Sequence, residues 1–298
     1  MSTDFFDYVK ELPDESFDAR RRGLVGFDAR YARIGANLRL VLERNDVEAW
    51  SKKTHGRVLP AVRSIADRYP LVLFEGDVGT GKTATAESSA DRLCRDLRRE
   101  GQILKLSTRV RGQGLHGEMS RLIQEGFRQL VAEAGKRRLA FLLMDEADAL
   151  ATRRDTDQMH QEEKAGVNTL IQKLDELRGV QGRALVFLTT NRPEILDPAV
   201  VRRASVRCIF ERPSDEERRE LLIAELDGAG LTGVEVDELV RLTGPATHDG
   251  VGFTYSDIRH RLLPEAIAAV YPDKRLSFEV LRDMAAVVSP APVVGAPR

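Results

Sequence analysis

The sequence has little that would suit a secreted, membrane-spanning or nucleic-acid-coating protein. It holds only two cysteines, Cys94 and Cys208, in 298 residues, which excludes a disulfide framework and favours the reduced thiols of a cytoplasmic protein. No apolar run approaches the roughly 18 residues that a membrane span needs. The 46 basic and 47 acidic side chains leave a net charge of −1. That balance argues against a dedicated nucleic-acid binder, which carries a basic excess.

Metal-ligand patterns and internal repeats are also missing. The five histidines lack the spacing of a metal site, so each is expected to be structural or exposed. What remains is an ordinary globular composition, with 42% hydrophobic and 31% charged residues. A chain of this length predicts roughly two domains, each able to bury a core.

The stretch GDVGTGKT at residues 76 to 83 matches the pattern G-x-x-x-x-G-K-[ST] without a mismatch. In that pattern, glycines let backbone N–H groups approach phosphates, the lysine (Lys82) lies between the β- and γ-phosphates, and the hydroxyl (Thr83) binds Mg²⁺. The pattern therefore predicts a nucleoside triphosphate site. The residues assigned to it are Gly76, Asp77, Val78, Gly79, Thr80, Gly81, Lys82, Thr83 and Ala84.

The surroundings of this loop fit the same interpretation. An apolar run, LVLFE at 71 to 75, precedes it and reads as a strand. Ala86, Ala90, Leu93 and Leu97 follow on one helical face. Strand, loop and helix are the setting that the motif requires. The alternative is a glycine-rich turn that happens to contain a lysine.

Strands alternate with helices from about residue 66 to residue 212. Strands are predicted at 71 to 75, 103 to 106, 139 to 144, 185 to 190 and 207 to 210. This alternation indicates an α/β domain with a mostly parallel sheet that is covered on both faces. Residues 1 to 65 read as a separate, partly helical segment without recognisable chemistry.

Past Pro213 the strand signal ends. Ser214 and Glu217 form a capping box, and helical patterns continue to about residue 288, which predicts a small all-helical domain over 213 to 288. Residues 289 to 298 are rich in proline and small residues and are predicted to be disordered.

Two acids follow the apolar strand at 139 to 144. Since ligands of doubly wound sheets lie at the carboxyl edge of the strands, Asp145 is expected to hold Mg²⁺ and Glu146 to polarise the attacking water as a general base. The alternative is a helix N-terminus with favourable acids. At the end of the next strand, Asn191 would hold that water, although asparagine is also a common turn residue.

Clustered arginines follow in LDPAVVRRASVR, at positions 202, 203 and 207. Such a cluster is usually a solvated face. A phosphate-facing arginine here would instead reach into the nucleotide site of a neighbouring subunit and accelerate hydrolysis by about 10³ to 10⁵.

In this order, GDVGTGKT, LLMDEAD, LTTN and DPAVVRRAS resemble the motifs of AAA+ ATPases over residues 24 to 288. The resemblance implies ATP with Mg²⁺, a parallel five-stranded sheet in the order 5-1-4-3-2, a helical lid and a ring, usually a homo-hexamer. Within this superfamily, VVRRAS, FERPSDEER and GFTYSDIRHRLLPEA resemble the pachytene-checkpoint family, whose members remodel HORMA-domain proteins. Its bacterial members act beside cyclic-oligonucleotide synthases in anti-phage operons. By position, the resemblance selects Arg203 as the trans-acting arginine.

Two positions depart from that family. Ser256 stands where the family has a lid arginine (sensor two), so that role is empty or shifted to Arg259. The substrate pore loop is expected at Gly114, Leu115 and His116, where remodellers usually carry an aromatic residue; an ordinary surface loop is the alternative. The charged stretch 152 to 164 is either a second pore loop or a solvated connection.

Other functions stay open. A helicase or clamp loader would need a basic stripe or a DNA-reading module, and neither is evident. A non-hydrolysing nucleotide switch is disfavoured by Glu146 and Asn191. An activase that frees an inhibited metabolic enzyme differs only in its partner.

Overall fold

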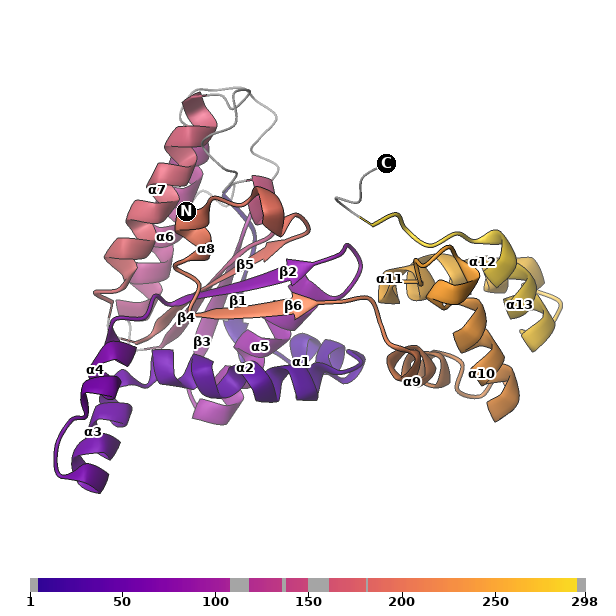
Figure 1. The fold of residues 1–298 in the computed structure, drawn as a ribbon, viewed down its shortest axis with the longest axis horizontal. Helices are drawn as coiled ribbons and strands as arrows, with labels where there is room; N and C mark the ends of the chain where they lie inside the picture. The colour runs from indigo at the N-terminus through magenta and orange to yellow at the C-terminus, as the bar shows by residue number, and fades with distance from the viewer. Residues whose placement is uncertain (1–4, 108–117, 136–137, 150–160, 181, 294–298) are drawn as a thin grey trace. The chain divides into compact units, whose positions relative to one another are not determined.

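The computed structural model describes residues 5–107, 118–135, 138–149, 161–180 and 182–293 (Figure 1). The chain divides into two compact units, which are treated separately below. The first unit contains Met1–Gly23, Phe27–Glu75 and Thr83–Ile209; the second contains Leu24–Gly26, Gly76–Lys82 and Phe210–Arg298. None of the helices in the described ranges is long and apolar enough to cross a membrane.

A mixed six-stranded sheet organises the first unit. Its strands are β1 (Phe6–Leu12), β2 (Leu71–Gly76), β3 (Gly101–Leu106), β4 (Leu139–Met144), β5 (Ala184–Thr190) and β6 (Val206–Phe210). They lie in the order β1-β3-β4-β5-β2-β6. The pairs β3–β4, β4–β5 and β5–β2 are parallel, as expected for strands connected through helices.

The predicted five-stranded parallel sheet is wrong because the N-terminal segment adds β1. This strand runs antiparallel to β3, from the pair Phe6↔Leu106 to the pair Leu12↔Gly101. Along FDYVKEL, exposed and less exposed residues alternate, as in an edge strand with one solvated face. Three of its seven residues are charged, so the strand does not stand out from its polar neighbours in the sequence. The predicted strand order is therefore incomplete at the β3 edge.

Side chains that alternate along the strands fill two separate layers. One layer joins Leu104, Leu142 and Val186 to helices α6 (Glu118–Gly135) and α7 (Gln161–Leu177) in a continuous apolar cluster. Figure 1 shows these two helices side by side. In the other layer, the Phe187 ring lies 5.8 Å from Phe74 and 6.1 Å from Phe141. Helix α5 (Lys82–Leu97) covers this second face, since a Cβ on Gly101 would meet the Cys94 sulfur of α5 at 2.7 Å.

The N-terminal segment belongs to the first unit and is bound to α5 by buried carboxylates. Besides β1, this segment contains α1 (Glu15–Arg22), α2 (Phe27–Leu42), α3 (Arg44–His55) and α4 (Pro60–Ala66). The first unit also contains the short helix α8 (Pro198–Val201) before β6. The Tyr8 hydroxyl donates to Glu87 at 2.6 Å, and Arg20 pairs with the same carboxylate. The Asp14 amide donates to Asp91 at 2.7 Å. These bonds fix β1 and α1 against the helix that begins at the phosphate loop.

Helices make up most of the second unit. It contains α9 (Asp215–Glu225), α10 (Gly233–Leu242), α11 (Tyr255–Asp257), a π-helical turn (Ile258–Leu262), α12 (Leu263–Val270) and α13 (Phe278–Val287). The predicted capping box is confirmed, because the Glu217 amide donates to Ser214 Oγ and the Ser214 amide donates to the Glu217 carboxylate. Leu221, Leu239 and Phe253 are among the buried residues of its own core.

The C-terminal segment departs from the predicted disorder over residues 289–293. The Ala291 amide donates to Asp257 Oδ2 at 3.1 Å, and the Ala291 carbonyl accepts from Arg212 at 2.7 Å. Two long-range hydrogen bonds to one residue hold this part of the chain on the second unit. Neither partner is near Ala291 in sequence, so composition alone did not indicate the contact.

We predict that Tyr8→Phe lowers the free energy of unfolding by about 1.5 kcal/mol, because the substitution removes a donor from a carboxylate that is 3% exposed. Chemical denaturation of the purified protein measures this change. Tyr271→Phe is the matched control, since Tyr271 is 79% exposed. Equal effects of the two substitutions would show that the Tyr8–Glu87 bond does not stabilise the fold.

Candidate nucleotide-binding site

The predicted phosphate loop connects β2 to α5, and two of its glycines are required by close contacts. Gly76 has φ +144°, and a Cβ there would lie 2.0 Å from the Phe210 carbonyl oxygen. Gly79 has φ +75°, and a Cβ there would lie 2.7 Å from Thr254 Oγ1. Any other residue at either position would force backbone or buried atoms apart. The conformation of the loop therefore requires glycine at both positions.

Lys82 closes the loop onto itself. Its ammonium group donates to the carbonyl oxygens of Gly76 at 3.0 Å and Asp77 at 2.6 Å, and the residue is only 6% exposed. The Thr80 hydroxyl also donates to the Asp77 carbonyl, at 2.7 Å. A positive charge is thus held within the curve of a loop whose backbone can approach phosphate oxygens.

In the first unit, Asp145 gathers donors from three other elements. Its two carboxylate oxygens lie 2.9 and 3.0 Å from Thr83 Oγ1, at the start of α5. Lys105 of β3 lies 3.1 Å from Oδ2, and the Thr189 hydroxyl of β5 donates to Oδ1. Burial disfavours the charged carboxylate, but the bond from Thr189, the charge of Lys105 and the bond from Thr83 outweigh it and lower the pKa of Asp145.

Glu146 and Asn191 follow the same carboxyl edge of the sheet. The register Met144↔Leu188 brings the ends of β4 and β5 level. Glu146 is exposed and has φ +52°, an uncommon conformation for a non-glycine residue that often marks functional sites. Its amide lies 3.4 Å from Thr189 Oγ1. Asn191 is half-buried, and its side chain makes no hydrogen bond to the described residues.

The oxygen ligands fit magnesium better than a protein-only metal centre. Within the described ranges there is no cluster of three or more His, Cys, Asp or Glu side chains that could hold a metal ion. Thr83 and Asp145 supply one hydroxyl and one carboxylate that lie together. Magnesium commonly takes such a small set and completes its shell with water and substrate phosphates.

Arg202 and Arg203 have different surroundings. Arg203 donates twice to Asp175, at 2.9 Å each, and once to the Ala199 carbonyl at 2.9 Å, and its guanidinium lies 5.2 Å from the centre of the Tyr69 ring. The bond to Asp175 raises the pKa of Arg203. Arg202 is exposed and forms no side-chain hydrogen bond or ion pair with the described residues.

The two arginines lie at the end of a short helix and in the turn that follows it. Arg202 has helical backbone angles at the end of α8, and residues 202 and 203 form a turn. The third arginine of the cluster, Arg207, lies on β6 and binds Glu75 at 2.8 Å. Arg207 thus forms an ion pair between two strands of the sheet.

Ser256, at the position of the family's lid arginine, lies against the phosphate loop. Its amide donates to the Gly79 carbonyl at 3.2 Å. Arg259 instead binds Glu225 of α9 at 2.6 Å. Arg259 thus has a partner within the helical unit.

Other predicted site residues cannot be located. Gly114, Leu115 and His116 lie outside the described residues, and so do residues 152–160 of the second predicted pore loop. Residues 161–164 of that stretch open helix α7.

Three residues near the predicted site escaped sequence reasoning: Lys105, Thr189 and Arg212. Lys105 is the only charge in the apolar run ILKL, which is the one signal that could have singled it out. Thr189 stood in LTTN beside Asn191 but was not assigned a role. Arg212 binds Asp77 of the phosphate loop with its Nε at 2.6 Å from Oδ2. That contact spans 135 positions and leaves no local pattern.

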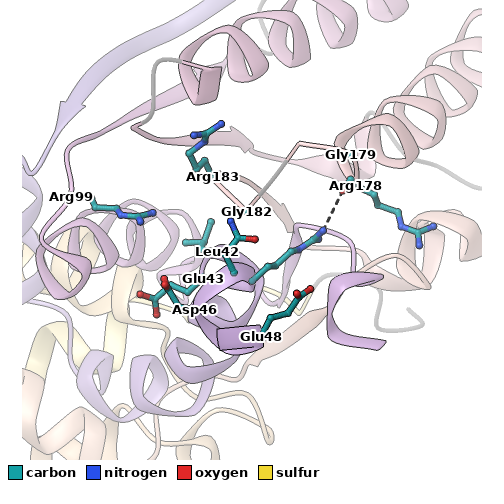
Figure 2. Close-up of a pocket in the computed structure, with 11 residues that line it drawn as sticks. Leu42, Glu43, Asp46, Glu48, Arg99, Arg178, Gly179, Gly182 and Arg183 are labelled. Carbon is teal, nitrogen blue, oxygen red and sulfur yellow. Dashed lines mark hydrogen bonds between the residues drawn. The ribbon is translucent and has the colours of Figure 1, made fainter. Parts of the chain in front are cut away.

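A cavity of about 290 Å³ lies elsewhere in the first unit (Figure 2). Arg99, which precedes β3, and Arg183, which precedes β5, place it at the amino ends of the strands. Arg44, which also lines the cavity, donates from Nη1 to the Arg178 carbonyl at 3.2 Å. The cavity includes none of the predicted site residues, whereas Asp145 and Asn191 follow the carboxyl ends of their strands. It is therefore separate from the predicted chemistry.

Comparison with known proteins agrees with this geometry. Residues 72–212 match the family model "ATPase family associated with various cellular activities (AAA)". The chain is 44% identical to CD-NTase-associated protein 6 of Escherichia coli strain KTE188 over 291 residues, which cover 97% of each chain. The matched fold and its phosphate loop define an ATPase of the AAA class.

Solved structures narrow the class further. A chain in the structure of the E. coli MS115-1 HORMA:CdnC:Trip13 complex is 39% identical, with a TM-score of 0.90 over 98% of this chain and 99% of that one. Rhizobiales Trip13 is 34% identical, with a TM-score of 0.74 over 96% and 99%. The chain belongs to the Trip13-like AAA ATPase family that includes CD-NTase-associated protein 6.

We predict that Thr83→Val weakens magnesium-dependent nucleotide binding at least tenfold, whereas Thr83→Ser keeps it within about threefold, because only the hydroxyl contacts Asp145 and suits Mg²⁺. Titration of a fluorescent ATP analogue with and without Mg²⁺ measures both affinities. If valine and serine behave alike, the hydroxyl is not a magnesium ligand.

Proposed function

We propose that this chain is a ring-forming, ATP-hydrolysing remodeller that disassembles a HORMA-domain protein and its complex with a cyclic-oligonucleotide synthase in anti-phage defence. The similarity to a chain of the HORMA:CdnC:Trip13 complex, at a TM-score of 0.90 over nearly the whole length, carries this proposal. A cytoplasmic location and a homo-hexamer are part of the proposal and follow the expectation for the family.

In the proposed site, the loop from Gly76 to Thr83 binds ATP, and Lys82 exchanges its two carbonyl partners for phosphate oxygens. Magnesium, held by Thr83 and Asp145 with the phosphates, would neutralise charge on the transferred phosphoryl group. Glu146 takes a proton from the attacking water, and Asn191 orients that water. Glu146 is exposed, and the Asn191 amide makes no hydrogen bond within the described part of the chain, which suits both groups to these roles.

Arg203 is proposed to complete the site of the neighbouring subunit. A guanidinium aimed at the γ-phosphate stabilises the transition state more than the ground state. In the proposed mechanism, Arg203 would leave its bidentate bond to Asp175 to reach that phosphate. Gly114, Leu115 and His116 remain our proposal for the loop that grips the protein substrate.

The alternatives differ in the partner. A helicase or clamp loader would hydrolyse ATP faster in the presence of DNA, whereas a protein remodeller would not. An activase would release a metabolic enzyme and not a HORMA-domain protein. The likeness to a chain solved together with a HORMA protein supports the first proposal over both.

We predict that Glu146→Gln binds ATP normally but lowers turnover by about 10² to 10⁴, since it removes only the proton acceptor. Lys82→Ala should lose ATP binding itself, because the lysine contacts phosphate in the ground state. Isothermal titration and a phosphate-release assay separate the two effects. Undiminished turnover in Glu146→Gln would falsify the assignment of Glu146 as the base.

We predict that Arg203→Ala lowers turnover by about 10³ or more with ATP affinity within a few-fold, whereas Arg202→Ala costs far less. The decisive experiment mixes Arg203→Ala chains, which keep the phosphate loop, with Lys82→Ala chains, which keep the arginine. Mixed rings should recover part of the activity that neither variant has alone. If light scattering confirms mixing and no activity returns, the arginine acts within its own chain or only holds the ring together.

A further inference from the structure

Arg212, just before the capping box of α9, connects three segments of the second unit. Its Nε donates to Asp77 Oδ2 at 2.6 Å, its Nη1 to the Gly252 carbonyl at 2.6 Å and its Nη2 to the Ala291 carbonyl at 2.7 Å. The side chains of Arg212 and Asp77 are only 14% and 11% exposed. All three guanidinium nitrogens therefore donate hydrogen bonds, one to the carboxylate of a largely buried ion pair and two to backbone carbonyls.

Asp77 lies inside the phosphate loop, so its charge matters for the ligand. Its Oδ1 accepts from the Val78 amide at 2.8 Å, while its carbonyl accepts from Thr80 and Lys82. The orientation of the carboxylate and that of the backbone carbonyl are thus set together. A carboxylate in a loop that receives a triphosphate repels the ligand unless a cation neutralises it. Arg212 is the cation that contacts it.

The C-terminal segment is bound from two sides. Ala291 gives its carbonyl to Arg212 and its amide to Asp257, which is 2% exposed. Asp257 also accepts from the Thr254 amide at 2.9 Å. Thr254 in turn approaches the loop, since a Cβ on Gly79 would lie 2.7 Å from its hydroxyl. Both side chains that hold Ala291 therefore belong to the surroundings of the phosphate loop.

We propose that Arg212 is a positioning residue for the phosphate loop, and that residues 289–293 form a strap that holds Arg212 in place. Arg212 neutralises the charge of Asp77 and fixes the conformation of the loop. Because the C-terminal segment holds Arg212, attachment of that segment also raises the affinity of the loop for nucleotide. This inference rests on the proposed ATP binding by the loop. It adds an arginine and a C-terminal segment that support the loop and that belong to no sequence motif.

The test compares Arg212→Gln, Asp77→Asn and the double variant by ATP titration and steady-state kinetics. Arg212→Gln should weaken ATP binding and raise KM about tenfold, with kcat within about twofold, because it leaves a bare carboxylate in the loop. Asp77 belongs to the loop, so Asp77→Asn has an effect of its own; in that background, however, adding Arg212→Gln should change ATP affinity by less than about twofold, because no bare carboxylate is left. Arg219→Gln is the matched control, because Arg219 lies on α9 and pairs with Asp237 at 2.6 Å, and it should leave affinity unchanged.

A merely structural role would lower the thermal midpoint of Arg212→Gln and weaken ATP binding as much in the Asp77→Asn background as in the wild type, and that result overturns the positioning role. A second experiment, on nucleotide-free protein, tests the strap separately. Exchange of the Ala291 amide hydrogen, which is bonded to Asp257, should be faster in Arg212→Gln than in Arg219→Gln, and equal exchange refutes the strap. Wild-type protein that binds no ATP would refute the proposed function itself. If the wild type binds ATP and Arg212→Gln binds it equally well, only this inference is refuted.

Discussion

The hydrogen bond between Thr83 and Asp145 is the contact on which the proposed site depends. Thr83 is fixed by the start of α5, and Asp145 is fixed by the end of β4. Lys105 and Thr189 reach the same carboxylate because β3 and β5 flank β4 in the sheet. The parallel register at this edge thus brings two hydroxyls, a carboxylate and a cation from four elements together.

Much of this arrangement follows from short stretches of sequence. The strand at 139 to 144 agrees with β4 residue for residue, because six consecutive apolar residues can only be buried on both faces. GDVGTGKT lies between a strand and a helix, as its motif requires. These features are local, so the sequence reveals them directly.

The features that were missed depend on contacts between distant residues. Strand β1 was hidden because Val9 lies on its more exposed face and Lys10 on its less exposed face, so apolar and polar residues do not alternate cleanly. Lys105 acquires its role only through the pairing of β3 with β4, and Arg212 acquires its role through Asp77 and Ala291. No spacing rule connects such positions. The helical turn at Arg202 likewise depends on how α8 ends.

The arginine pair illustrates how the fold constrains the proposed mechanism. Arg203 is held by a carboxylate, a carbonyl and an aromatic ring, whereas Arg202 faces solvent. A role for Arg203 across a subunit boundary requires that it leave Asp175 for a phosphate, which offers the same bidentate geometry with more charge. The exchange is chemically reasonable because both acceptors present paired oxygens.

The central claim is that ATP hydrolysis at this sheet edge drives the disassembly of a HORMA-domain complex. The most direct measurement follows, by fluorescence, the dissociation of a preformed complex between a labelled HORMA-domain protein and its synthase after this protein is added. Dissociation should require ATP and magnesium and should stop with a non-hydrolysable analogue. Dissociation at the same rate without nucleotide, or an intact complex during sustained ATP turnover, would contradict the account.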